Sequence, residues 1–126
     1  MDIIIILLKN YYSILKSKIL NFIKVKKLTL AGAKISDYGS VIIEGDLTIG
    51  KNIYIGRNVI FRGKVKLSDE VKIENNCELT DCHIGGKTII KSNSILDECD
   101  IGKESSIGPY SRLRPKTTIG DNSQIG

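Results

Sequence analysis

The 126-residue sequence is poor in aromatic residues, with no tryptophan, two phenylalanines and five tyrosines. Aromatic rings fill much of the volume of a compact core. Their scarcity argues against a thick globular core and favours a thin, aliphatic one. A single domain is expected at this length.

Histidine and cysteine are also scarce. His83 is the single histidine. No serine–histidine–aspartate order or carboxylate pair surrounds it, so we assign no catalytic residue and expect a solvated side chain. The three cysteines, Cys77, Cys82 and Cys99, are odd in number, and no secretory signal precedes them. We therefore expect free thiols and a cytoplasmic protein.

Acidic residues are nearly absent from residues 1–27, where six lysines stand against Asp2 alone and account for the net charge of +5. The remaining residues carry 13 basic and 13 acidic side chains and are neutral. A neutral body offers no broad phosphate-binding surface, so nucleic acid is not expected as a partner.

Long apolar runs are missing as well. The run Ile3–Leu8 ends at Lys9 and is far shorter than the roughly 20 residues of a membrane span. Within residues 3–27 apolar residues recur at steps of three and four, which predicts a helix. Residues 1–28 are therefore expected as an amphipathic, linker-like helix. Ile3–Leu8 is apolar all round and needs a cover, either its own domain or another subunit. The lysines leave an interfacial membrane helix as an alternative, but no membrane partner is expected.

From residue 43 onward the apolar residues recur every six positions, with two slips of one residue. A second and often smaller residue follows four positions later, and Gly or Asn stands between. The main series is Ile43, Ile49, Ile55, Phe61, Leu67, Ile73, Leu79, Ile84, Ile90, Leu96, Ile101, Ile107, Leu113, Ile119 and Ile125.

This period matches neither a helix nor a simple strand, but it matches a parallel β-helix built from hexapeptides. Three hexads form one triangular coil, so residues 29–126 are expected as an all-β solenoid of about five coils. The main series should fill the column, and Gly and Asn should form corners because both tolerate a left-handed backbone. Hexapeptide prisms are left-handed as a class.

The two slips lie in "LTDCHIG" (79–85) and "LDECDIG" (96–102). Each should shorten one corner by a residue, in consecutive coils. Cys82 and Cys99 should then stack at neighbouring levels, which would permit a disulfide, although the expected compartment argues against one. A zinc site with His83 is a weaker alternative because the spacing lacks paired C-x2-C motifs, and no metal site is assigned.

Three stretches carry a resemblance to a known family: "LTLAGAKISD" (28–37), the run 41–85, and "IGPYSRLRPKTTIGDNSQIG" (107–126). They resemble the C-terminal acetyltransferase domain of the bifunctional GlmU family, which makes UDP-N-acetylglucosamine for peptidoglycan and lipopolysaccharide. The resemblance implies a cytoplasmic homotrimer that moves an acetyl group from acetyl-CoA to glucosamine-1-phosphate. The arginine before proline in "RLRP" contacts that substrate in the family, and it falls on Arg114. A guanidinium suits a sugar phosphate.

The resemblance also predicts what this chain lacks. The uridyltransferase domain, which uses magnesium, would precede residue 1. The catalytic histidine would follow Gly126, and Lys116 replaces the usual glycine after "RP". We therefore expect a fragment that is inactive alone and holds no cofactor, with sugar phosphate as a weak ligand. The alternative is a non-catalytic trimeric scaffold, or half of a split enzyme that docks a separate chain carrying further coils.

Overall fold

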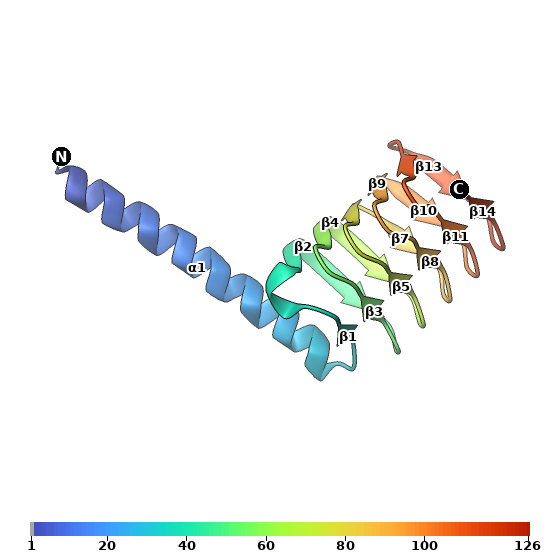
Figure 1. The fold of residues 1–126 in the computed structure, drawn as a ribbon, viewed down its shortest axis with the longest axis horizontal. Helices are drawn as coiled ribbons and strands as arrows, with labels where there is room; N and C mark the ends of the chain where they lie inside the picture. Colours follow the sequence, from blue (N-terminus) through green and yellow to red (C-terminus); the bar gives the residue numbers. More distant parts are fainter. Residues whose placement is uncertain (1) are drawn as a thin grey trace.

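The computed structural model describes residues 2–126 and shows one long helix followed by stacked short strands (Figure 1). The elements are α1 (Ile3–Leu30), β1 (Lys34–Ile35), a short 3-10 helix η1 (Tyr38–Ser40), β2 (Ile42–Ile49), β3 (Tyr54–Ile55), β4 (Ile60–Leu67), β5 (Lys72–Ile73), β6 (Glu78–Thr80), β7 (His83–Ile84), β8 (Ile89–Ile90), β9 (Ile95–Asp97), β10 (Cys99–Ile101), β11 (Ser106–Ile107), β12 (Arg112–Leu113), β13 (Thr117–Ile119) and β14 (Gln124–Ile125).

The strands form three faces of a prism, and each strand pairs in parallel with its counterpart one coil away. One face has the order β1-β3-β5-β8-β11-β14. The long strands β2 and β4 cover both other faces. The first half of β4 pairs with β6, whereas its second half pairs with β7. The expected parallel hexapeptide β-helix, preceded by one helix, is confirmed.

The main apolar series lies in the column of the prism, as predicted. From Ile55 to Ile107 its members are at most 1% exposed. The members in the last coil, Leu113, Ile119 and Ile125, are half-buried. The small residues of the second series fill the corners. Thr88 is fully buried, and its hydroxyl donates to the Gly102 carbonyl at 2.8 Å.

The corners confirm the prediction for asparagine and correct it for glycine. The five corner asparagines all adopt a left-handed backbone, with φ between 54° and 64°: Asn52, Asn58, Asn76, Asn93 and Asn122. The glycines that open these corners, such as Gly85 and Gly102, do not have this conformation. They are required because consecutive coils approach closely. A Cβ on Gly85 would lie 2.5 Å from the backbone carbon of Gly102.

The first slip shortens its corner as expected. Arg62 pairs with Thr80 before the corner, and Lys66 pairs with His83 after it. The upper coil therefore passes the corner with one residue fewer than the coil below. The second slip gives the following coil the same short corner, so His83 pairs with Asp100 and Ile84 pairs with Ile101.

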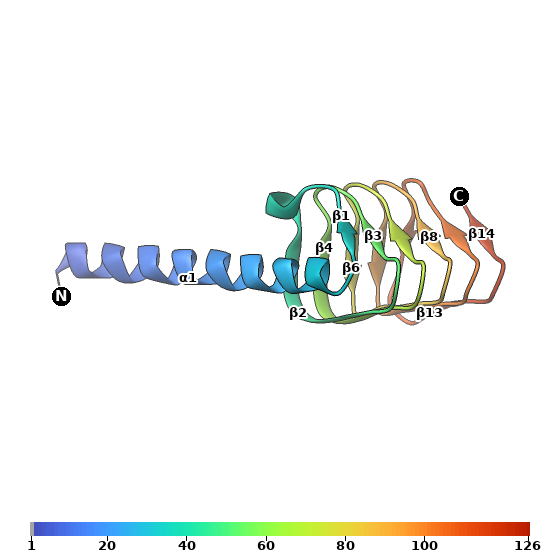
Figure 2. The same ribbon diagram turned by 90° about the horizontal axis from the view of Figure 1, so that it is seen from below.

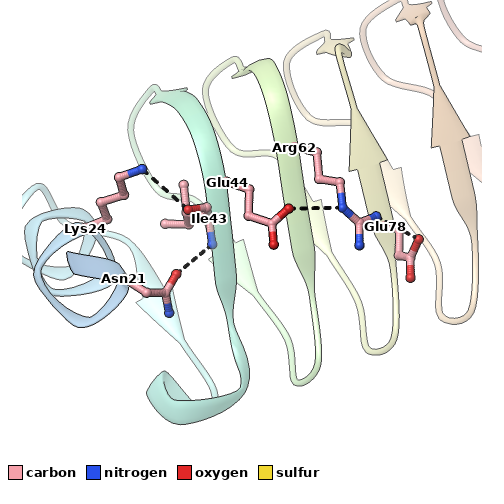
Figure 3. Close-up of polar contacts among 6 residues, drawn as sticks. All are labelled: Asn21, Lys24, Ile43, Glu44, Arg62 and Glu78. Carbon is pink, nitrogen blue, oxygen red and sulfur yellow. Dashed lines mark hydrogen bonds and ion pairs between the residues drawn. The ribbon is translucent and has the colours of Figure 1, made fainter. Parts of the chain in front are cut away.

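Helix α1 begins at Asp2, whose carboxylate accepts from the Ile4 amide at 3.0 Å, and continues to Leu30, beyond the expected end at residue 28. Its last part covers the open edge of β2. The Asn21 side chain donates to the Val41 carbonyl at 2.9 Å and accepts from the Ile43 amide at 2.8 Å (Figure 3). The helix therefore satisfies backbone groups that an edge strand otherwise leaves unpaired.

The rest of α1 projects away from the prism along its axis (Figure 2). The expectation that the chain's own domain covers Ile3–Leu8 is wrong, because these side chains are 42% to 71% exposed. No helix within residues 2–126 is long and apolar enough to cross a membrane.

Candidate functional site

Arg114, the residue singled out by the sequence, lies on the outer surface of the last coil. Arg112 and Leu113 form β12 and pair with Ile95 and Leu96 of β9, so Arg114 follows in line with Asp97. Leu113 points into the column, and strand alternation therefore directs both arginines outward. Both are exposed. The resemblance predicts no role for Arg112, but this residue lies on the same face as Arg114.

The two arginines are free of close carboxylates. Within residues 2–126, no ion pair of Arg112 or Arg114 is found at 4.0 Å or less. Ile95, one coil below Arg112, is an exposed apolar residue. Two outward guanidinium groups two residues apart can bind an anion from the same side.

The lower part of this face is neutralised internally. Arg62 lies between two carboxylates, with its Nε 3.3 Å from Glu44 and an Nη 3.2 Å from Glu78 (Figure 3). Sequence reasoning predicts solvent or intersubunit contacts for Arg62 and misses these partners. An exposed ion-pair ladder of this kind adds little stability, but it leaves the upper arginines as the anion-binding end of the face.

A second polar region lies on the neighbouring face, where the corners are shortened. His83 Nδ1 lies 3.5 Å from Asp100 Oδ1, one coil step away, and the side chain of His83 is about half exposed at 48%. These residues line an open hollow of about 480 Å³ together with Asp46, Lys64 and Asp81. Positive and negative groups alternate there, so the hollow has no single charge preference.

The cysteines lie beneath that hollow, in the corner positions of the column. Cys77, Cys82 and Cys99 are free and buried. Cys82 precedes β7 and Cys99 begins β10, so they stack one coil apart, as predicted from the slips. Burial raises the pKa of the Cys82 thiol to about 12 and also raises the pKa of Cys99. These thiols therefore stay protonated near neutral pH and are poor nucleophiles.

The donor set for a metal is thin. Within residues 2–126, no group of three or more histidine, cysteine, aspartate or glutamate side chains is placed to hold a metal ion. The magnesium implied by the resemblance therefore fits none of the described residues, and no chemical step is derived through it.

Comparison with known proteins adds a family to this geometry. The model of the GMPPB C-terminal domain family matches residues 38–126, which is most of the prism. The chain belongs to the GMPPB C-terminal domain family.

Relatives of this member of the GMPPB C-terminal domain family include the bifunctional protein GlmU, as the sequence resemblance predicts. The GlmU of Pseudoalteromonas atlantica is 35% identical over 105 residues, 83% of this chain and 23% of that protein. The GlmU of Dichelobacter nodosus is 41% identical over 103 residues, 82% of this chain and 22% of that protein. The chain thus spans less than a quarter of the length of these two relatives.

A solved structure supports the fold. The hexapeptide transferase family protein from Anaplasma phagocytophilum aligns with a TM-score of 0.52 at 20% identity, over 75% of this chain and 69% of that one. This likeness is to the β-helix alone. The resemblance to a hexapeptide transferase domain is therefore supported by sequence and by fold.

Sequence reasoning misses the outward neighbours of several residues. His83 lies beside Asp100, Arg114 is in line with Asp97, and Arg62 contacts carboxylates of the coils above and below it. Each of these neighbours is separated by about one coil length in the sequence. The coil length, readable from the slips, would indicate them if it were applied to outward positions as well as to the column.

Proposed function

We propose that this chain is part of an acetyltransferase-type β-helix, that it binds a phosphorylated amino sugar through Arg114, and that it does not transfer acetyl groups by itself. The observation that carries the proposal is the exposed guanidinium of Arg114 at the upper end of its face, with no ion-pair partner within residues 2–126. The GlmU resemblance supplies the substrate class, glucosamine-1-phosphate, and the donor, acetyl-CoA.

The placement of His83 supports the inactive part of the proposal. Acetyl transfer to an amine needs a general base close to the acceptor. His83 lies on β7, on a different face from β12 and two coils below it. It cannot act on a sugar held by Arg114. None of the described residues is assigned to acetyl-CoA.

Loss of the Arg114 guanidinium should weaken sugar-phosphate binding. Hydrogen bonds to charged groups contribute about 1.5–3 kcal/mol, so Arg114→Ala should raise the Kd for glucosamine-1-phosphate by roughly 10- to 100-fold. Isothermal titration calorimetry measures this change. Arg57→Ala is the matched control, because Arg57 is exposed at another corner, and it should leave Kd unchanged. Equal Kd values for both variants would contradict the assignment of Arg114.

An activity assay tests the other half of the proposal. The purified chain should not acetylate glucosamine-1-phosphate in the presence of acetyl-CoA. Turnover above that of a protein-free control would contradict the proposed inactivity, whatever the binding experiment gives.

We also propose that the chain forms a homotrimer through the prism and is cytoplasmic, with residues 1–28 and 29–126 as two functional parts. The GlmU resemblance supports the trimer, and the three free thiols are consistent with the compartment. Sedimentation equilibrium of the full chain should give three times the 13.9 kDa monomer mass. A monomer across the micromolar range would contradict it.

A scaffold is the second candidate function. Leu113, Ile119 and Ile125 are half-buried, whereas Leu96, Ile101 and Ile107 one coil below are at most 1% exposed. An apolar coil surface of this kind can dock another polypeptide that carries further hexads. Co-purification of such a chain would favour the scaffold over the sugar-binding function.

A further inference from the structure

The largest unpartnered surface of the molecule lies on α1. Fourteen apolar side chains between Ile3 and Ile23 are each at least 42% exposed: Ile3, Ile4, Ile5, Ile6, Leu7, Leu8, Tyr11, Tyr12, Ile14, Leu15, Ile19, Leu20, Phe22 and Ile23. Most of them lie on the part of the helix that projects beyond the prism (Figure 1). Exposed apolar patches of this extent mark an interaction surface.

The apolar side chains are concentrated on the side of α1 that faces away from the prism. Leu8, Tyr12, Leu15, Ile19 and Ile23 follow one another at steps of four, three, four and four residues, which places them along one stripe. Asn21 and Val25, which contact the prism, lie on nearly the opposite side at 100° per residue. A flat surface can therefore contact the stripe without a clash with the β-helix.

The charges on α1 all have one sign. Its range Ile3–Leu30 includes six lysines and no acidic residue. Lys9 and Lys16 flank the stripe, seven residues apart on one line of the helix. A bundle of copies of α1 would bring lysines together with no carboxylate on the helix to pair them. An anionic lipid surface, in contrast, pairs with lysines and receives apolar side chains.

We propose that α1 lies flat on the surface of an anionic phospholipid bilayer, with the stripe in the boundary between headgroups and acyl chains. A transverse position would bury the ammonium groups of Lys9, Lys16 and Lys18, which is costly. Tyr11 and Tyr12 suit the boundary because each ring has an apolar body and a polar hydroxyl. The proposal is independent of sugar binding. It revises the expectation from the sequence, since the structure leaves the apolar residues uncovered.

Cosedimentation with sucrose-loaded vesicles tests the proposal on the full chain. Vesicles of phosphatidylcholine with about a third phosphatidylglycerol should bind the protein at least ten-fold more tightly than phosphatidylcholine alone, and 0.5 M salt should weaken the binding. Leu15→Asp with Ile19→Asp should abolish it. Lys9→Gln, Lys16→Gln and Lys18→Gln together should weaken it about a hundred-fold, at about 1 kcal/mol per lysine.

The matched control replaces three exposed lysines of the prism, Lys51, Lys64 and Lys103, by glutamine. It removes the same charge and should retain binding. Thermal unfolding of the prism should be the same in all variants, since the substituted side chains are exposed. Absence of vesicle binding, equal binding to both lipid compositions, or equal loss in the prism control would overturn the proposal. So would a lipid-free oligomer that dissociates in the Leu15→Asp, Ile19→Asp variant without any vesicle binding, because a second copy would then be the occupant.

Discussion

Gly85→Ala should destabilise the chain by about 3 kcal/mol, a large share of the stability of a small domain. The added Cβ would lie 2.5 Å from the Gly102 carbonyl carbon and 2.5 Å from the Lys103 nitrogen. Both are backbone atoms of the next coil, and the parallel pairing of β7 with β10 holds them in place. The overlap can be relieved only by separation of the two coils.

Gly120→Ala is the matched control. Gly120 occupies the equivalent corner one coil beyond Gly102, but nothing lies within 4 Å of the position of its Cβ. The free energy of unfolding should change by no more than about 0.5 kcal/mol. Urea unfolding followed by far-UV circular dichroism measures both variants. A similar loss in both would mean that helical or strand propensity, rather than close approach of the coils, accounts for these glycines.

Ile90→Ala should cost about 3–4 kcal/mol, because it removes a fully buried side chain from a column that cannot collapse around the cavity. Ile125 stands two coils further along the same column, after Ile107, and is only half-buried. Ile125→Ala should cost about 1 kcal/mol, since less apolar surface is lost there. The same urea experiment compares the two variants. Equal losses would contradict a solenoid in which each coil is stabilised by its two neighbours.

The column could be predicted from the sequence because the inward positions recur regularly. A triangular coil admits one large apolar side chain per hexad, so Ile73, Ile90 and Ile107 carry both the period and the core. The corner asparagines could be predicted for the same reason, since the left-handed backbone restricts the residue type. The slips indicated the coil length and the stacking of Cys82 on Cys99.

The outward positions could not be predicted as well, because solvent accepts many residue types. The contacts of Arg62 with Glu44 and Glu78 depend on which side chains stack across coils. The reason for the corner glycines also lies between coils: a Cβ at Gly85 would overlap the backbone of the next coil at Gly102. The exposure of α1 depends on how far the helix extends beyond the prism, which its own periodicity does not determine.

The proposed sugar-phosphate site is tested most directly by a backbone amide NMR titration of the ¹⁵N-labelled chain with glucosamine-1-phosphate. Binding through Arg114 predicts chemical-shift changes confined to residues 112–117 and the adjoining end of β9, and their loss in Arg114→Ala. Shift changes confined to the hollow around His83 and Asp100, or none at millimolar ligand, would contradict it.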